Sequence, residues 1–387
     1  MTSLIRAAEH TGIQPIDDIN SPTAPGAGYV RQDVTQDSKR RRHGTFHAFL
    51  PASLVRERKA RLKICTNALA TRLEFDLDES GGLRATGVHF EATDYIGLGP
   101  RSHLETMGIP VVREMPGIGN YLQDHAAVCL TFEVPMNDSL HQLEASRIKV
   151  IKELATYLIS GGGLLSYPLQ PITIYLPSKL LDNDANLSTA DKQDLDSGDV
   201  ANCADLEFMP EANNCTDHVI PCKGLFSFII ALIRPKSHGS VRLATSNPRA
   251  RPEVDLGFLT NPEDMVPLKK GIKFGLRLAE DMRKQGYPLK NLIVPEDLDD
   301  SSLDNFIRQN LRTCYHYTST CRMGAEADLL NPGVVDAELR VHGVQGLRVC
   351  DASVFPEIVG AHTMAPVVMV AEKCADLIKD TYRAGSM

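Results

Sequence analysis

The C-terminal end of the chain constrains its fold more than any other segment. Residues 346–353 have the apolar pattern of a strand that ends at Asp351. Residues 364–382 have an apolar stripe at helical spacing, and Pro366 suits an early helical position. A helix N-terminus offers N–H groups and a positive dipole end, which together stabilise an anion. The sequence therefore predicts a strand–loop–helix unit, with His362 just ahead of an anion-binding helix end.

The rest of the chain mixes strand and helix patterns in an irregular order. Residues 62–75 and 87–90 have strand patterns around a turn at 78–82, which predicts a β-hairpin. Helices are expected over 102–107, 148–159, 262–284 and 302–311, and strands over 109–112 and 225–233. This order predicts an α+β / α/β fold, because a barrel or a repeat needs a regular alternation of elements.

Charge and apolar content exclude several classes of protein. The 387 residues hold 41 Lys and Arg against 49 Asp and Glu, a net charge of −8, whereas a nucleic-acid binder needs a basic surface. No apolar run reaches the roughly 18 residues of a transmembrane helix. The nine cysteines form no C-x-x-C pair, and residues 1–20 lack the apolar core of a secretory signal. We therefore expect a cytoplasmic chain with free thiols, no nucleic-acid partner and no membrane span.

Nucleotide, hydrolase and metal motifs are incomplete in this sequence. No Gly-x-Gly pair completes G-x-G-x-x-G, and neither a Walker loop nor a G-x-S-x-G elbow occurs; the incomplete pairs begin at Gly26, Gly97 and Gly117. Cys314, His316 and Cys321 lie close together, but their spacing matches no common zinc module. We expect no metal site.

Two histidines flank the C-terminal strand–loop–helix unit. His316 lies within a run of small hydroxyl residues at 315–320, and His362 precedes the last helix. An imidazole titrates near neutral pH and so suits general acid–base chemistry. Ordinary polar histidines under loops would give the same pattern, and the residues alone leave both interpretations open.

Long stretches of the C-terminal third resemble the glucose–methanol–choline (GMC) flavin-dependent oxidoreductases. The family pattern H-P-x-(G/S)-T-C-R-M-G resembles residues 316–324, with Tyr317 in place of the proline. The pattern V-V-D-x-x-L-R-V-H-G-V-x-G-L-R-V-x-D-A-S-V-x-P resembles residues 334–356, and the A-P…A-E-K helix resembles residues 365–373. Earlier segments match as well, among them Leu122-Gln123-Asp124-His125, so the resemblance spans nearly the whole chain.

The resemblance implies a flavoprotein that binds FAD non-covalently and oxidises the CH–OH group of a small-molecule alcohol. His316 falls on the position of the family's general base for hydride transfer to flavin N5, and His362 falls on that of a second His or Asn. Five further residues fall on positions whose backbone meets the cofactor: Ala70 at the adenine, Asp351 and Ala352 at the phosphate and ribityl region, and Thr363 and Met364 at the flavin pyrimidine end.

The resemblance also divides the chain into three parts. Residues 1–125 would be a partial FAD-binding domain, 126–310 a substrate-binding domain on an antiparallel sheet, and 311–387 the C-terminal FAD-binding and catalytic segment. The family's G-x-G-x-x-G strand–helix start would precede Met1, and most of its second signature motif is missing after Ala92. The chain therefore resembles a truncated member, with an FAD-binding domain remnant interleaved with a substrate domain.

Three functions stay open on this basis. The first is an FAD-dependent alcohol oxidase or dehydrogenase, similar to choline dehydrogenase. The second is a truncated, non-catalytic GMC paralogue or incomplete gene product that cannot hold FAD. The third is a non-redox relative such as a lyase. Missing inner strands would expose sheet edges and core faces, which predicts aggregation or a homodimer.

Overall fold

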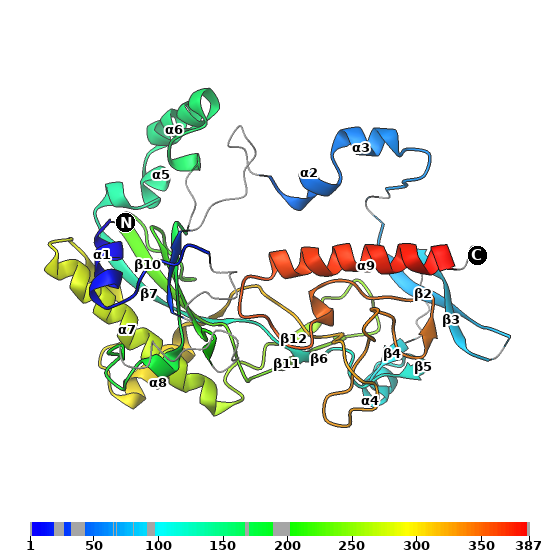
Figure 1. Cartoon of the computed structure of the whole chain (residues 1–387). Coiled ribbons are helices and arrows are strands. Elements are labelled where there is room, and N and C mark those ends of the chain that lie inside the picture. Colours follow the sequence, from blue (N-terminus) through cyan, green and yellow to red (C-terminus); the bar gives the residue numbers. More distant parts are fainter. Residues whose placement is uncertain are drawn as a thin grey trace. The chain divides into compact units, whose positions relative to one another are not determined.

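The computed structural model describes residues 2–18, 27–31, 43–64, 66, 68–79, 81–90, 97–166, 170–188 and 202–384. The chain divides into two compact units, and Figure 1 labels many of their elements. Unit 1 comprises Met1–Ile64, Ala126–Ile233 and Glu263–Arg312, and unit 2 comprises Cys65–His125, Arg234–Pro262 and Thr313–Met387.

This division differs in part from the three expected segments. A boundary at 125/126 is present, and the boundary expected at 310/311 lies at 312/313. The first 64 residues, however, group with 126–233 instead of with the rest of 1–125. Helix α1 (Thr2–His10) packs on α7 (Met265–Lys284), and strand β1 (Gly28–Arg31) pairs with β8 (Ile172–Leu176). Residues 234–262 group with the C-terminal segment, since strand β11 (Gly239–Arg242) pairs with β6 (Asn120–Leu122). The cofactor and substrate roles of the segments stay predictions.

The centre of unit 1 is a seven-stranded sheet (Figure 1). Its order is β1-β8-β9-β10-β7-β13, with β14 also paired to β7, and every pair along that order is antiparallel. The strands are β1 Gly28–Arg31, β7 Ala126–Val134, β8 Ile172–Leu176, β9 Leu206–Glu211, β10 Gly224–Leu232, β13 Lys290–Ile293 and β14 Leu311–Thr313. The predicted strand at 225–233 is confirmed as β10, and the antiparallel sheet confirms the expected mixed α+β class.

Helix α7 (Met265–Lys284) covers strands β7, β9 and β10 of this sheet. Its buried face includes Met265, Leu268 and Ile272, and Gly271 lets the helix approach closely because a Cβ there would lie 2.7 Å from Cγ2 of Ile230. The edge-to-face contact between Phe208 and Phe274, with ring centroids 5.3 Å apart, joins sheet and helix. The helical spacing of residues 262–284 thus encodes the packing of unit 1.

The remaining helices of unit 1 are shorter. They are α1 Thr2–His10, α2 Thr45–Phe49, α3 Ala52–Glu57, α5 His141–Ala145, α6 Arg147–Ser160 and α8 Asp300–Asn310, with 3₁₀ turns at Met136–Asp138, Leu164–Ser166 and Ser178–Leu180. The predicted helix at 148–159 is confirmed as α6, which begins at the Ser146 cap and ends at Gly161 (φ 65°). Helix α8 confirms the helix expected over 302–311.

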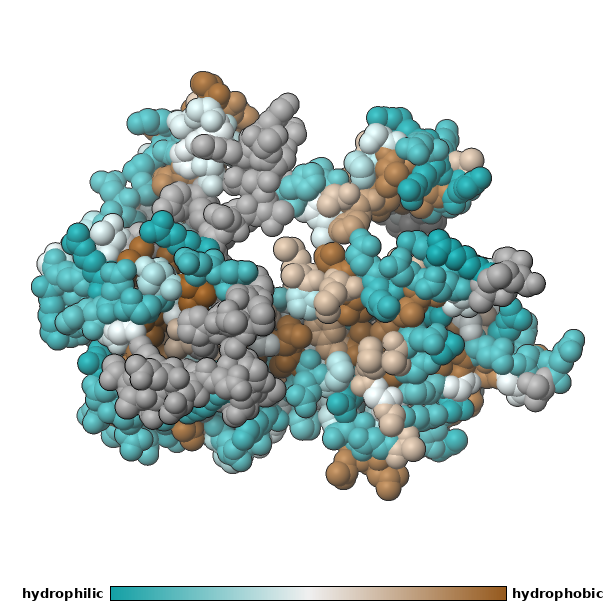
Figure 2. Space-filling view, viewed as in Figure 1, coloured by the Kyte–Doolittle hydropathy of each residue, from teal (hydrophilic) through white to brown (hydrophobic). Residues whose placement is uncertain are grey.

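Helix α6 presents apolar side chains to solvent, as the apolar surface at the top of Figure 2 shows. Ile148 and Ile159 are 81% and 87% exposed. Its polar face points the other way: Lys149 Nζ donates to Asn137 Oδ1 (3.2 Å), and a Glu153 carboxylate oxygen accepts from the Leu164 N–H (2.8 Å). This orientation is the reverse of that of an ordinary surface helix.

Unit 2 is built from three small sheets and the long helix α9 (Met364–Ala384). Strands β2 (Ala70–Leu77) and β3 (Leu83–Phe90) form the predicted hairpin, and β15 (Val344–Gln345) lies parallel to β3. The other elements are β4 Gly97–Gly99 parallel to β5 Val111–Glu114, the antiparallel set β12 Glu253–Asp255, β11 Gly239–Arg242 and β6 Asn120–Leu122, helix α4 Arg101–Thr106, and a 3₁₀ turn at Ala352–Val354. A further 3₁₀ turn, Pro262–Asp264, spans the sequence boundary between the two units.

The core of unit 2 packs residues 334–355 against α9. Val334, Val335 and Val341 are buried there together with Phe355 and the α9 residue Cys374. Among the described helices, none combines the length and the apolar character that crossing a bilayer requires.

Candidate active site

Three histidines of unit 2 lie against one another. Nδ1 of His125 lies 2.9 Å from Nδ1 of His316, and the two rings meet edge to face with centroids 4.9 Å apart. The His362 ring also contacts His316, with centroids 4.8 Å apart and an interplanar angle of 68°. The structure therefore brings together both sequence-predicted histidines and adds a third, which the sequence interpretation did not single out.

The backbone around His316 is held by pairing with the segment that ends at His125. Gln123 and Thr318 exchange backbone hydrogen bonds of 3.2 and 2.9 Å, and the Cys314 N–H donates to the His125 carbonyl (3.1 Å). Between these bonds, Tyr315 adopts φ 61°, in the left-handed region that non-glycine residues rarely occupy. The loop that carries His316 is thus fixed at both ends and turns sharply beside it.

Asp124 fixes the loop from inside the protein. Its side chain is buried, Oδ1 accepts from the His316 backbone N–H (2.8 Å), and Oδ2 accepts from the Thr313 hydroxyl. Burial raises the pKa of the Asp124 carboxyl, while the hydrogen bonds that it accepts oppose that rise. Asp124 therefore acts on His316 through the backbone.

The N-terminus of α9 lies immediately after His362. Thr363 and Met364 precede and begin the helix, and the Val367 N–H donates to the Thr363 carbonyl (3.0 Å). Met364 is 60% exposed, so this helix end is accessible within unit 2. A helix of 21 residues directs the positive end of its dipole to this position.

Asp351 and Ala352 are tied to the same loop as His316. The Asp351 carboxylate accepts from the Ser353 N–H (2.8 Å) and caps its own turn, so that oxygen is already engaged locally. The Ala352 carbonyl accepts from the Ser319 N–H (3.2 Å), and the Ser353 carbonyl accepts from the Cys321 N–H (2.9 Å). Backbone hydrogen bonds therefore join this turn to the residues that follow His316 in the same loop.

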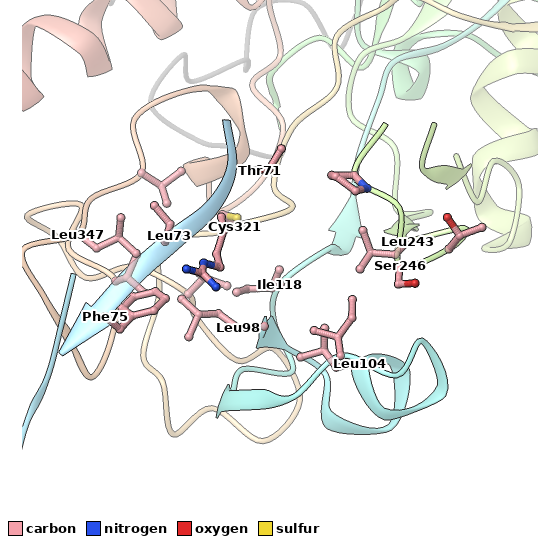
Figure 3. Close-up of a pocket in the computed structure, with 18 residues that line it drawn as sticks. Thr71, Leu73, Phe75, Leu98, Leu104, Ile118, Leu243, Ser246, Cys321 and Leu347 are labelled. Atoms are coloured by element: carbon pink, nitrogen blue, oxygen red, sulfur yellow. The ribbon is translucent and has the colours of Figure 1, made fainter. Parts of the chain in front are cut away.

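Ala70 lies in a different part of unit 2. It is the exposed first residue of β2, and the next strand residues line a cavity of about 410 Å³ (Figure 3). Leu73 on β2 forms one wall, and Leu98 and Leu104 form another. The lining is mostly apolar and includes none of the three histidines. The structure thus does not bring Ala70 into contact with the histidine cluster.

Among the described residues, no group of three or more His, Cys, Asp or Glu side chains is arranged to hold a metal ion.

A family model described as GMC oxidoreductase matches residues 235–371, which include His316 and His362. The oxygen-dependent choline dehydrogenase 1 of Chromohalobacter salexigens is 27% identical over 403 residues, covering 97% of this chain. That of Pseudomonas fluorescens strain SBW25 is 26% identical over 407 residues.

This chain belongs to the GMC oxidoreductase family. It spans about two thirds of the length of these dehydrogenases, 67% and 66% respectively. Two solved structures share the fold of this GMC oxidoreductase. A formate oxidase matches with a TM-score of 0.79 at 22% identity, covering 99% of this chain and 70% of its own. A fungal aryl-alcohol oxidase matches with a TM-score of 0.76 at 22% identity, covering 98% of this chain and 71% of its own.

The sequence interpretation missed the two residues that hold His316. Asp124 and His125 belong to the Leu122-Gln123-Asp124-His125 segment, whose family resemblance was noted without assigning it a role. Their proximity to His316 arises from pairing between two segments, since His125 and His316 are 191 residues apart in the sequence. The segment's family resemblance was the only signal that pointed to them.

Proposed function

We propose that this GMC oxidoreductase binds FAD non-covalently and oxidises the CH–OH group of a small-molecule alcohol. The observation that carries this proposal is the His316–His362 pair at the N-terminus of α9. Bound FAD would supply the hydride acceptor. The choline dehydrogenases among the relatives make choline the first alcohol to test.

The residues that would hold FAD suit some parts of the cofactor better than others. The N-terminus of α9 at Thr363 and Met364 suits an electron-poor ring that gains negative charge, because the helix dipole stabilises an anion there. The turn at Asp351 and Ala352 offers backbone groups beside the same loop. The mostly apolar cavity that begins next to Ala70 suits a flat ring such as adenine.

In this proposal His316 is the general base. An imidazole takes a proton from a hydroxyl efficiently near neutral pH, and such proton transfer contributes about 10²–10⁴-fold to a rate. The fixed loop holds the ring in one place, so little reorganisation accompanies the transfer. His362 contributes a second polar group beside it and would hydrogen-bond the same substrate oxygen.

Two variants test these roles when flavin occupancy and turnover are measured separately. His316→Ala should lose turnover far more than FAD occupancy, because a base acts on the transition state. His362→Asn should be the milder change, since an amide keeps a hydrogen-bonding group at that position. Equal loss of FAD and turnover in His316→Ala would rule out the general-base role.

The non-catalytic and lyase alternatives predict different results in the same experiment. A non-catalytic paralogue would retain no flavin in the wild-type chain. A lyase would retain flavin, but no alcohol would reduce it.

A further inference from the structure

His125 makes two hydrogen bonds that together define which of its ring nitrogens carries a proton. Its Nε2 lies 3.0 Å from the carbonyl oxygen of Val359. A carbonyl oxygen only accepts hydrogen bonds, so His125 Nε2 must carry the hydrogen. A neutral imidazole carries only one N–H, which leaves Nδ1 of His125 as an acceptor.

Burial favours this neutral state of His125. Its side chain has no solvent-exposed surface, and placing a positive charge in such a position is costly. Since His125 Nδ1 accepts, the hydrogen in the 2.9 Å contact must come from His316 Nδ1. Neutral His316 then has its lone pair on Nε2.

We infer that His125 is a positioning residue that sets the tautomer of His316, so that Nε2 of His316 is the atom that accepts a proton. The role as base rests on the proposed function, whereas the tautomer does not. Neither His125 nor its tautomer was part of the sequence-based assignment of catalytic residues.

Neighbouring residues keep this hydrogen-bond chain in register. The Gln123 side chain accepts from the Ile358 N–H (2.9 Å), which fixes the segment that carries the Val359 carbonyl. Asp124 binds the backbone of His316, while His125 binds its ring. These three consecutive residues therefore hold both His316 and the segment that carries the Val359 carbonyl.

Two substitutions separate the acceptor at position 125 from its bulk. His125→Asn keeps a side-chain oxygen that can accept from His316 Nδ1, but it shortens the reach to Val359. His125→Phe keeps a flat buried ring and removes every hydrogen-bonding atom. Far-UV circular dichroism and the midpoint of urea unfolding establish that each variant is folded.

The tautomer is read by NMR of the 387-residue chain labelled with ¹⁵N in the rings of its 12 histidines. The measurement is made above the ordinary imidazole pKa of about 6.5, and the His316 signals are assigned by their loss in His316→Asn. It requires neither FAD nor substrate.

We expect wild-type His316 to carry its hydrogen on Nδ1 and His125 on Nε2. His125→Asn should keep the His316 tautomer, and His125→Phe should shift it towards Nε2–H. A wild-type His316 protonated on Nε2 would overturn the inference, and it would do so even if His125→Phe failed to fold. An unchanged His316 tautomer in folded His125→Phe would overturn it as well.

Turnover then tests the consequence of the tautomer. With FAD bound, His125→Phe should lower kcat by at least about tenfold at unchanged FAD occupancy, and by no more than the roughly 10²–10⁴-fold that a general base contributes. His125→Asn should lose less. Equal kcat in the two variants would contradict the positioning role. If the wild-type chain neither binds FAD nor oxidises an alcohol, the proposed function fails, while the NMR result still decides the tautomer.

Discussion

Asp124 offers the sharpest test of how the His316 loop is held. Asp124→Ala leaves the His316 N–H and the Thr313 hydroxyl without their acceptor. Each buried donor without a partner costs about 1–3 kcal/mol. The hydroxyl can turn towards Tyr317 Oη at 3.3 Å, which recovers part of that loss. We therefore expect Asp124→Ala to lower the free energy of unfolding by about 2–4 kcal/mol, and Asp124→Asn by less than about 1 kcal/mol because its amide keeps an acceptor.

The contribution of Asp124 to the free energy of unfolding should change with pH in a defined direction. Burial raises the pKa of Asp124 in the folded protein, so the folded state holds this proton more tightly than the unfolded chain. Stability contributed by this group is therefore present at low pH and decreases as pH rises above the ordinary aspartate value. Asp124→Asn does not titrate, so its stability relative to wild type should improve with rising pH across that window.

Urea unfolding followed by far-UV circular dichroism measures both effects, since the chain contains no tryptophan for fluorescence. Matched urea series of wild type, Asp124→Ala and Asp124→Asn are compared from acid to neutral pH. The reasoning is refuted if Asp124→Asn is as unstable as Asp124→Ala at neutral pH. A difference between wild type and Asp124→Asn that does not change with pH would refute the assigned direction of the pKa shift.

Three further predictions concern the scaffold. Gly271→Ala places a methyl group 2.7 Å from the buried Ile230 side chain, so thermal unfolding should show a loss of about 1–3 kcal/mol despite alanine's better helix propensity; an unchanged or higher midpoint would contradict this. Asp299 caps α8 by accepting two backbone N–H groups, so Asp299→Ala should cost about 1 kcal/mol and Asp299→Asn almost nothing, and equal losses in urea would contradict the cap. Burial raises the pKa of the Cys129 thiol to about 12, so a maleimide at neutral pH should label the exposed Cys203 and spare Cys129 until the chain unfolds; labelling of Cys129 at the same rate would show that its surroundings are open.

Local patterns predicted the helices well because their signals lie within each helix. The helix expected over 262–284 corresponds to α7, and the helix expected over 148–159 corresponds to α6, which ends at Gly161. The helix expected over 364–382 is confirmed as α9, Met364–Ala384. In each case the signal is a periodicity or a stop residue, and neither depends on distant partners.

Strands were predicted less well, because a strand exists only where it has a partner and extends only as far as that partner. The strand expected over 346–353 was wrong: this segment has an isolated bridge at Arg348 and a 3₁₀ turn that begins at Ala352. The alternation that begins at residue 62 predicted a long strand, but β2 starts at Ala70, where its pairing with Phe90 starts. Ile64, which the alternation placed in that strand, is 55% exposed. The strand expected over 109–112 lies at Val111–Glu114, since its limits follow its pairing with β4.

The candidate site shows the same division. His316 and His362 were predicted from their flanking motifs, and their rings lie together. His125 was not predicted, because its role depends on a contact made only in the folded protein with His316 and the Val359 carbonyl. The separation of Ala70 from the histidines likewise follows from tertiary structure, which motif alignment does not describe.

The central claim is that this chain binds FAD beside His316 and uses the site to oxidise an alcohol. The most direct measurement is the visible absorbance of the purified chain after incubation with FAD and desalting, followed by anaerobic addition of choline and a panel of small primary alcohols. We expect the flavin bands to stay with the protein and at least one alcohol to bleach them in wild type but not in His316→Ala. A chain that retains no flavin, or whose bound flavin is bleached by dithionite but by no alcohol, would contradict it.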